Sequence, residues 1–404
     1  MLFTNPRALR AAYPSELRSI MSIERAEESR RWLNAWNGIA RGATPVYDLP
    51  GVARKLGVAR FSVKDESERS SLGSFKALGA PIALVRQILR LYPDLDPVAI
   101  LTGGYTELLK SYTVISATDG NHGRGLAAAA RDAGCRCVIV LHANVSAERE
   151  EAIAELGAEI VRIKGNYDAS VEEAARLAAA HGWQVVSDTS YDGYEDIPRD
   201  VMQGYGTIAA EIVEQTGARP NEAGAFTHVF LQGGVGGMAA GLISYLWEYH
   251  GKHRPCFIVV EPTQADCLMQ SAMHGYAAKT TGSVDSVMAG LACGETSPLA
   301  WKFLFTSVDH FMTVEDEQAI GSMRTLARGN DDDIPIVAGE SGVAGLAALE
   351  ILRGDLDLSK QAGLDSQSRV LIVNTEGATA PQVYELLVGE PAQAVKDRQA
   401  IAVR

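Results

Sequence analysis

From about residue 60 onward, the chain alternates short runs of β-branched and apolar residues with longer alanine-rich runs. The β-rich runs predict strands at 61–63, 113–117, 137–141, 159–163, 184–187, 229–232, 257–260 and 370–374. Helices are predicted between them, over ranges such as 125–133, 147–156, 170–181 and 238–249. This alternation is typical of a mostly parallel sheet wrapped by helices. We therefore expect an α/β fold whose ligand sites lie where a strand ends in a glycine-rich turn.

The length of the chain, 404 residues, favours two domains over a single core. Residues 91–112 contain Pro93, Pro97 and the pair Gly103-Gly104, which favour an irregular connection between two lobes. We expect a large domain built from residues 1–88 and 205–404 and a small domain of residues 89–204.

Bulk properties exclude several classes of protein. The formal net charge of −13 argues against a nucleic-acid partner, because phosphate backbones are bound by clustered Lys and Arg. No apolar stretch approaches the ~20 residues that a membrane span needs, and the N-terminus lacks the apolar core of a signal peptide. The five irregularly spaced cysteines favour a reduced, cytoplasmic enzyme without a metal site, although a pairing of Cys267 with Cys293 stays open.

Lys76 stands in the segment Ser-Phe-Lys-Ala-Leu-Gly of residues 74–79, at the start of a helix predicted over 77–89. Ser74 is a candidate N-cap, which places Lys76 in the first helical turn. The helix dipole disfavours positive charge there and pushes the amine toward its neutral form. A neutral lysine amine attacks carbonyl groups and carries Schiff bases. The alternative is a solvated surface lysine without a chemical role.

A four-glycine loop, Gly-Gly-Val-Gly-Gly, follows the strand predicted over 229–232 and precedes a helix. Backbone amides in such a loop point at an anion, and the helix N-terminus adds a favourable field. We therefore predict a phosphate site made by Gly233, Gly234, Val235, Gly236 and Gly237.

The same loop also fits a dinucleotide fingerprint. Gly234-x-Gly236-x-x-Ala239 has the required spacing, and the next strand ends in an acid, Glu261. An NAD(P)-dependent dehydrogenase is therefore an alternative from a different class, although it leaves Lys76 without a role.

A second glycine-rich turn, residues 116–123, reads Ser-Ala-Thr-Asp-Gly-Asn-His-Gly and follows the strand predicted over 113–117. Glycines leave the amide of Asn121 exposed, and that amide suits a ring hydroxyl or phenolate. Asp119 is either a ligand-facing carboxylate or an Asx-turn residue that bonds its own backbone. A histidine in the position of His122 is more often a hydrogen-bonded turn residue than a catalyst.

Together, the lysine, the Gly-Asn-His-Gly turn and the four-glycine loop resemble the fold-type II pyridoxal-phosphate enzymes, the tryptophan synthase β family, over residues 44–381. The resemblance implies pyridoxal 5'-phosphate as cofactor, two domains with mostly parallel twisted sheets, an active site in the cleft between them, and a homodimer. It makes Lys76 the Schiff-base lysine. The further cofactor-binding residues that it implies are Phe75, Asn121, the glycine loop, Glu340 and Thr375, the last on the pyridine nitrogen.

Segments 64–69, 118–123, 188–198 and 374–377 resemble those family members that release ammonia from 2,3-diaminopropionate. The resemblance implies Asp119 and Asp188 as catalytic carboxylates, which would also stabilise a cationic β-substituent of the substrate. It further implies Thr118, His122 and Tyr191 as substrate-binding residues. Ala378 and Ala380 depart from the more polar tail that is common after Gly377 in this subgroup.

The implied reaction is α,β-elimination of D- or L-diaminopropionate to pyruvate and two molecules of ammonia. Lys76 and Asp119 would remove the Cα proton from opposite faces, one for each enantiomer. The alternative within this fold is a dehydratase of serine, threonine or 3-hydroxyaspartate. Serine and threonine dehydratases of this fold typically carry a serine in the turn that holds Asp119 here.

Overall fold

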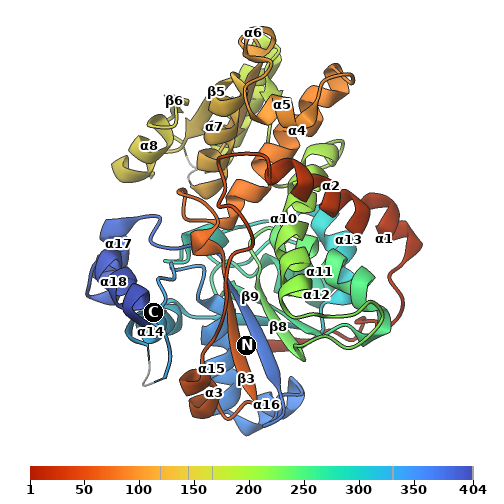
Figure 1. Ribbon diagram of the computed structural model, residues 1–404, viewed down its shortest axis with the longest axis vertical. Coiled ribbons are helices and arrows are strands. Elements are labelled where there is room, and N and C mark those ends of the chain that lie inside the picture. The colour runs from red at the N-terminus through yellow and green to blue at the C-terminus, as the bar shows by residue number, and fades with distance from the viewer. Residues whose placement is uncertain (119, 144, 166, 330–331, 403–404) are drawn as a thin grey trace. The chain divides into compact units, whose positions relative to one another are not determined.

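The computed structural model describes residues 1–118, 120–143, 145–165, 167–329 and 332–402. The chain divides into two compact units (Figure 1). The first unit comprises Met1–Ile23, Ala43–Glu68 and Ile208–Arg404, and the second comprises Glu24–Gly42 and Arg69–Thr207.

This division differs from the expected boundaries at residues 88 and 205. Residues 24–42 and 69–88, which we expected in the large domain, belong to the second unit, as do residues 205–207. For residues 69–88 the reason is helix α4 (Ala80–Leu91), whose apolar residues are buried on nearly every side. It packs against α7 (Asn121–Ala133) and carries the preceding segment into the second unit.

The first unit contains a seven-stranded sheet in the order β1-β10-β9-β8-β11-β3-β2. The strands are β1 (Leu2–Thr4), β2 (Val46–Asp48), β3 (Arg60–Asp65), β8 (His228–Gln232), β9 (Cys256–Pro262), β10 (His310–Val314) and β11 (Arg369–Asn374). The five inner strands run parallel, whereas the edge strands β1 and β2 are antiparallel to their neighbours. The inner strands are almost wholly buried, as expected for a parallel sheet covered on both faces.

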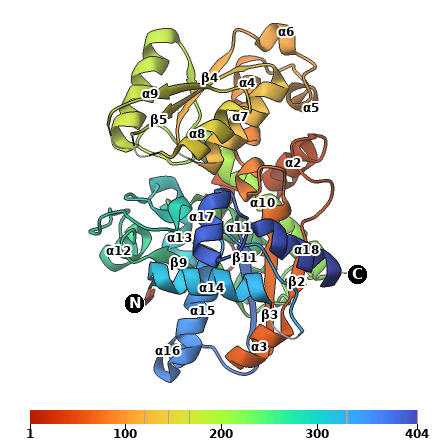
Figure 2. The same ribbon diagram turned by 90° about the vertical axis from the view of Figure 1, so that its left-hand side faces the viewer.

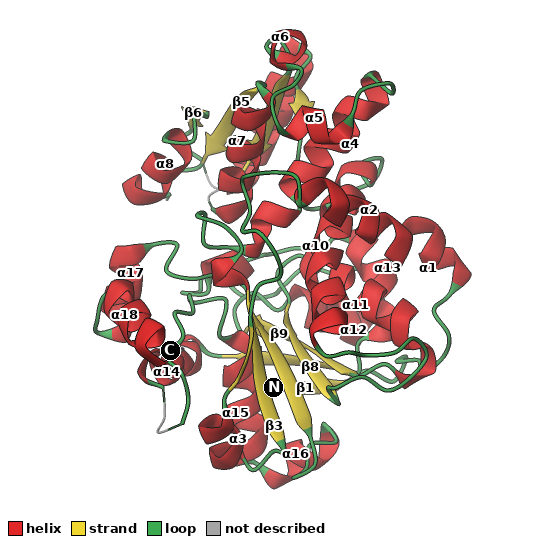
Figure 3. Ribbon diagram, in the orientation of Figure 1, coloured by secondary structure: helices red, strands yellow, loops and turns green. Residues whose placement is uncertain are grey.

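Helices cover both faces of this sheet. α3 (Pro50–Leu56), α14 (Asp316–Arg328) and α15 (Ala344–Gly354) share one apolar core with one face of the strands. α11 (Gly237–His250) and α13 (Pro298–Ser307) lie on the opposite side (Figure 3). The remaining helical elements of the unit are α1 (Ser15–Ile20), α12 (Cys267–His274), α16 (Leu356–Gln361), α17 (Pro381–Val388), α18 (Ala392–Ala402), η1 (Glu66–Glu68), η3 (Gly251–His253) and η4 (Ala289–Leu291).

The second unit is built on a four-stranded parallel sheet in the order β6-β5-β4-β7. The strands are β4 (Thr113–Ala117), β5 (Arg136–Leu141), β6 (Glu159–Arg162) and β7 (Gln184–Val185). α9 (Tyr167–His181) packs on one face through a small apolar cluster, and α7 packs on the other (Figure 2). The unit also contains η2 (Phe75–Leu78), α5 (Pro97–Leu101), α6 (Thr106–Leu109), α8 (Ala147–Ala154) and most of α2 (Ile23–Leu33). α10 (Asp196–Gln215) continues from this unit into the first.

The α/β class and the parallel sheets predicted from the alternation are confirmed. The irregular connection predicted over 91–112 is wrong, because this segment contains α5 and α6. Asp96 accepts hydrogen bonds from the amides of Val98 (2.7 Å) and Ala99 (3.0 Å), with Pro97 as the first helical residue. In the described part of the chain, every helix is too short or too polar to cross a bilayer.

Candidate active site

Lys76 lies in a single turn of 3-10 helix, η2, and not in the α-helix predicted over 77–89, which begins only at Ala80. The predicted N-cap is confirmed, because the Ser74 hydroxyl accepts a hydrogen bond from the Lys76 amide at 3.2 Å. The backbone that carries the lysine is therefore fixed locally at its start.

Two glycines on neighbouring helices hold η2 by direct backbone packing. A Cβ at Gly204 of α10 would lie 2.1 Å from the carbonyl oxygen of Leu78. A Cβ at Gly125 of α7 would lie 3.0 Å from the carbonyl oxygen of Lys76. Position 204 therefore requires a residue without a side chain, whereas a side chain at position 125 would be a tight fit, and both glycines belong to the second unit.

The side chain of Lys76 forms an ion pair with Asp188, which follows strand β7. Burial alone would raise the pKa of Asp188, but the charge of Lys76 and its hydrogen bond to the carboxylate outweigh burial and hold this pKa well below its usual range. Asp188 is therefore ionised at neutral pH. A carboxylate in contact favours the ammonium form of Lys76, which opposes the neutral amine expected from the helix dipole.

Side chains of the second unit fix the segment just before Asp188. His122 donates from Nε2 to the carbonyl of Val186 at 2.9 Å. The Tyr194 hydroxyl accepts from the amide of Ser187 and donates to the carbonyl of Val185, each at 3.0 Å. Because these bonds hold the end of β7, they determine where the Asp188 carboxylate lies.

The predicted substrate-binding residues of this unit differ in exposure. His122 is buried, its Nδ1 lies 3.9 Å from Asp188 Oδ2, and burial lowers its pKa. Tyr191 is 48% exposed, and its ring stacks on Tyr194 at 4.8 Å. A neutral, buried His122 fits a supporting role better than direct contact with substrate. The resemblance did not assign Tyr194 a role.

The turn before α7 is described only in part, and Asp119 lies outside the described residues. Thr118 and Asn121 are both half-buried, and Asn121 is the first residue of α7. The Thr118 hydroxyl accepts from the Gly120 amide at 3.5 Å. The side chain of Asn121 thus stands at a helix N-terminus that follows a parallel strand, where α/β folds bind ligands.

The four-glycine loop belongs to the first unit and joins β8 to α11 as predicted. Gly234 and Gly236 have φ of +58° and +98°, which favour glycine. Gly233 donates to the carbonyl of Val260 at 2.8 Å, and Gly236 donates to Gly233 at 3.0 Å. The amides of Gly234, Val235 and Gly237 have no backbone acceptor in the described part of the chain. Free amides at a helix N-terminus fit a phosphate group.

Glu261 decides against the dinucleotide alternative. It lies in β9, which ends one residue later at Pro262, and it is fully buried. Its two oxygens accept hydrogen bonds from the amides of Leu268 and Met269 at the start of α12, each at 2.8 Å. A carboxylate enclosed in this way is not free to bind a ribose hydroxyl, which a dinucleotide site requires.

Glu340 and Thr375 are both buried in the first unit. Gly339 donates to the carbonyl of Glu376 at 2.8 Å, and Ser341 donates to its carboxylate at 3.2 Å, so the two segments are tied together. Thr375 follows β11, the parallel neighbour of β8, which the glycine loop follows. Both therefore lie at the carboxyl end of adjacent strands, where open α/β sheets bind ligands.

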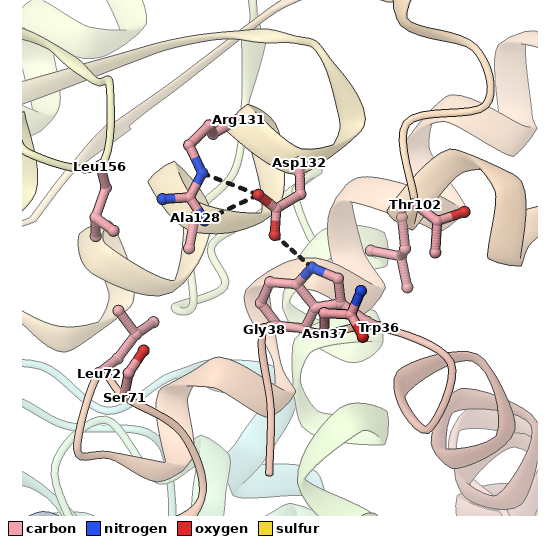
Figure 4. A pocket seen from close by; sticks show the side chains of 11 residues that line it. Trp36, Asn37, Gly38, Ser71, Leu72, Thr102, Ala128, Arg131, Asp132 and Leu156 are labelled. Atoms are coloured by element: carbon pink, nitrogen blue, oxygen red, sulfur yellow. Dashed lines mark hydrogen bonds and ion pairs between the residues drawn. The ribbon is translucent and has the colours of Figure 1, made fainter. Parts of the chain in front are cut away.

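The cysteines are not among the predicted site residues, although Cys267 and Cys293 lie beside the glycine loop. Cys267 and Cys293 are not joined by a disulfide, and Cys267 Sγ lies 3.4 Å from the carbonyl oxygen of Gly234. Among the described residues, no cluster of His, Cys, Asp or Glu is arranged to hold a metal ion. A cavity of about 410 Å³ in the second unit is lined by Trp36, Arg131 and Asp132 among others (Figure 4). None of its lining residues is a predicted site residue.

Comparison with known proteins gives three findings. A family model for pyridoxal-phosphate dependent enzymes matches residues 39–376. The diaminopropionate ammonia-lyase of Escherichia coli (strain K12) is 38% identical over 361 residues, which cover 87% of this chain and 88% of that protein. Crystal structures of the Escherichia coli enzyme, one in complex with D-serine and one with an aminoacrylate-PLP azomethine reaction intermediate, each align with a TM-score of 0.85. Each alignment has 35% identity and covers 96% of both chains.

Proposed function

Because the chain belongs to the family of pyridoxal-phosphate-dependent enzymes, we propose that it is an ammonia-lyase that converts 2,3-diaminopropionate to pyruvate and two molecules of ammonia. The observation that carries this proposal is the ion pair between Lys76 and Asp188. The ammonium group of Lys76 is the same chemical group as the β-ammonium of the substrate. A carboxylate that holds one of them fits the other.

The residues proposed to hold the cofactor are those of the glycine loop, Thr375 and Lys76. The amides of the glycine loop would bind its phosphate, Thr375 would donate to or accept from its ring nitrogen, and Lys76 Nζ would bond to its aldehyde carbon. Pyridoxal phosphate, when bound, supplies an electron sink for negative charge that develops at the substrate Cα. A neutral threonine opposite the ring nitrogen would leave the ring less electron-withdrawing than an aspartate partner would, which favours elimination over transamination.

Proton transfer at Cα is assigned to two residues of this chain. Lys76 Nζ would take the proton from one face of Cα, and Asp119 would take it from the other face for the opposite enantiomer. Asp188 is poorly suited as a base, because its pKa lies well below the usual range. We therefore assign Asp188 to holding the β-ammonium of the substrate.

The leaving group explains why a carboxylate is needed. When the Cβ–N bond breaks, its electrons leave with nitrogen, so that an ammonium group departs as neutral ammonia. Contact with Asp188 keeps that group protonated until the bond breaks. The released enamine then hydrolyses to pyruvate and a second ammonia. A hydroxyl leaving group would gain nothing from an ionised Asp188, which disfavours the dehydratase alternative.

The experiment is a substrate panel with the purified chain and pyridoxal phosphate. D- and L-diaminopropionate, serine, threonine and 3-hydroxyaspartate are compared for release of keto acid and ammonia. We expect diaminopropionate to give two ammonia per pyruvate and to be the fastest substrate. Absence of pyruvate from both enantiomers would overturn the proposal, and faster turnover of the hydroxy amino acids would identify a dehydratase. A homodimer and a cytoplasmic location are further predictions, the first testable by light scattering.

A further inference from the structure

Tyr205 is a buried phenol beside Lys76 that the proposed reaction does not yet use. It lies on α10, in the part that belongs to the second unit, and it is 1% exposed. Its ring packs on Phe75 with 4.8 Å between centroids, and a Cβ at Gly79 would lie 2.7 Å from its Cε1. The ring is therefore fixed against the 3-10 helix that carries the lysine.

Among the described residues, no group forms a well-oriented hydrogen bond with the hydroxyl of Tyr205. The hydroxyl nevertheless interacts with the side chain of Lys76. A buried hydroxyl left unpaired is destabilising, and phenylalanine would fill the same space without that cost. Burial, with a further contribution from the charge of Asp188, raises the pKa of Tyr205 against the opposing charge of Lys76. The phenol therefore keeps its proton at neutral pH and acts as a hydrogen-bonding group.

We propose that Tyr205 is a positioning residue for Lys76, an inference that rests on the proposed function. Its oxygen accepts a hydrogen bond from the ammonium form of Lys76, and its O–H donates to the nitrogen once that proton has left. Asp188 has no such second role, because an ionised carboxylate only accepts hydrogen bonds. Tyr205 therefore keeps a partner for the lysine nitrogen when Asp188 binds the substrate.

The test measures the protonation of the Lys76 amine and not the rate of turnover. Full-length chain freed of cofactor is acetylated with acetic anhydride over a range of pH, and the peptide that contains Lys76 is quantified by mass spectrometry. Because the charge-assisted bond to the ammonium form is stronger than the bond to the neutral amine, Tyr205→Phe should move the midpoint of Lys76 acetylation about one pH unit lower. Below the midpoint, acetylation of Lys76 should be about tenfold faster than in the wild type.

Tyr384→Phe is the matched control, because Tyr384 is also fully buried with an unpaired hydroxyl but lies on α17 in the first unit. It should leave the midpoint of Lys76 unchanged. An unchanged midpoint in Tyr205→Phe would overturn the proposal, as would a higher one, which would mean that the hydroxyl acts on Asp188. Added pyridoxal phosphate should protect Lys76 from acetylation. Lack of protection would refute the lysine assignment of the proposed function without affecting the Tyr205 result.

Discussion

Gly204→Ala tests whether backbone packing places Lys76. The new Cβ would lie 2.1 Å from the carbonyl oxygen of Leu78, where ordinary contacts begin at 3.4 Å, so α10 and η2 must separate by 3.4 − 2.1 = 1.3 Å. Overpacking of this kind costs about 1–3 kcal/mol, and a backbone obstacle that cannot rotate away puts the cost near the upper end. Alanine recovers about 1 kcal/mol of helix propensity. We expect the free energy of unfolding to fall by about 2 kcal/mol.

The catalytic effect should exceed the effect on stability. If η2 relieves the contact by moving, Lys76 is displaced by about 1 Å, which costs roughly 100-fold in rate. Urea unfolding and the rate of pyruvate release from diaminopropionate measure the two effects separately.

Two glycines provide graded controls. At Gly321 of α14 an added Cβ meets nothing within 4 Å, so Gly321→Ala should stabilise the chain by up to about 1 kcal/mol and leave the rate unchanged. Gly125→Ala places its Cβ 3.0 Å from the Lys76 carbonyl oxygen. Its stability and its rate should lie between those of Gly204→Ala and Gly321→Ala. The reasoning is refuted if Gly204→Ala unfolds at the wild-type urea concentration and keeps its rate within threefold.

Three further outcomes are expected. Lys76→Ala should lose borohydride-stable attachment of pyridoxal phosphate, measured by mass spectrometry of the intact chain; attachment at another lysine would contradict the assignment. Asp119→Asn should slow one diaminopropionate enantiomer more than the other, and an equal loss in kcat for both would remove its face-specific role. Asp188→Asn should be less stable than the wild type above about pH 4, because the lowered pKa of Asp188 stabilises the folded chain above its unfolded-state pKa. The difference should shrink on acidification in urea unfolding, and a pH-independent difference would count against the Lys76 pairing.

The parts of the fold that depend on local pattern could be predicted from the sequence. The inner strands β3, β8, β9 and β11 and the glycine loop after β8 follow from runs of apolar residues and from glycines at a strand end, whereas the inner strand β10 was not predicted. The edge strands β1 and β2 were missed because each has three residues, and pairing such as Leu2 with Met312 joins distant parts of the chain. Pro97 was interpreted as part of an irregular connection, although a proline that follows an aspartate N-cap is also common at the start of a helix.

In the site, too, contacts between residues close in the sequence could be predicted, whereas contacts between distant residues could not. The N-cap of Lys76 is a contact over two residues, and the sequence predicted it correctly. The ion pair with Asp188 joins residues 112 positions apart, and it reverses the charge state that the helix dipole alone favours. Tyr205 gave no signal, because a buried phenol is distinguished only by the atoms that surround it in three dimensions.

The contact between Gly204 and Leu78 also bears on how such an enzyme can change its substrate. The position of Lys76 depends on a peptide carbonyl and on the glycine at residue 204, and not on the apolar side chains around them. Replacements among the apolar side chains of the second unit can therefore accumulate while the attachment point of the cofactor stays in place. New substrate preferences can therefore evolve around a lysine whose position is fixed by main-chain packing.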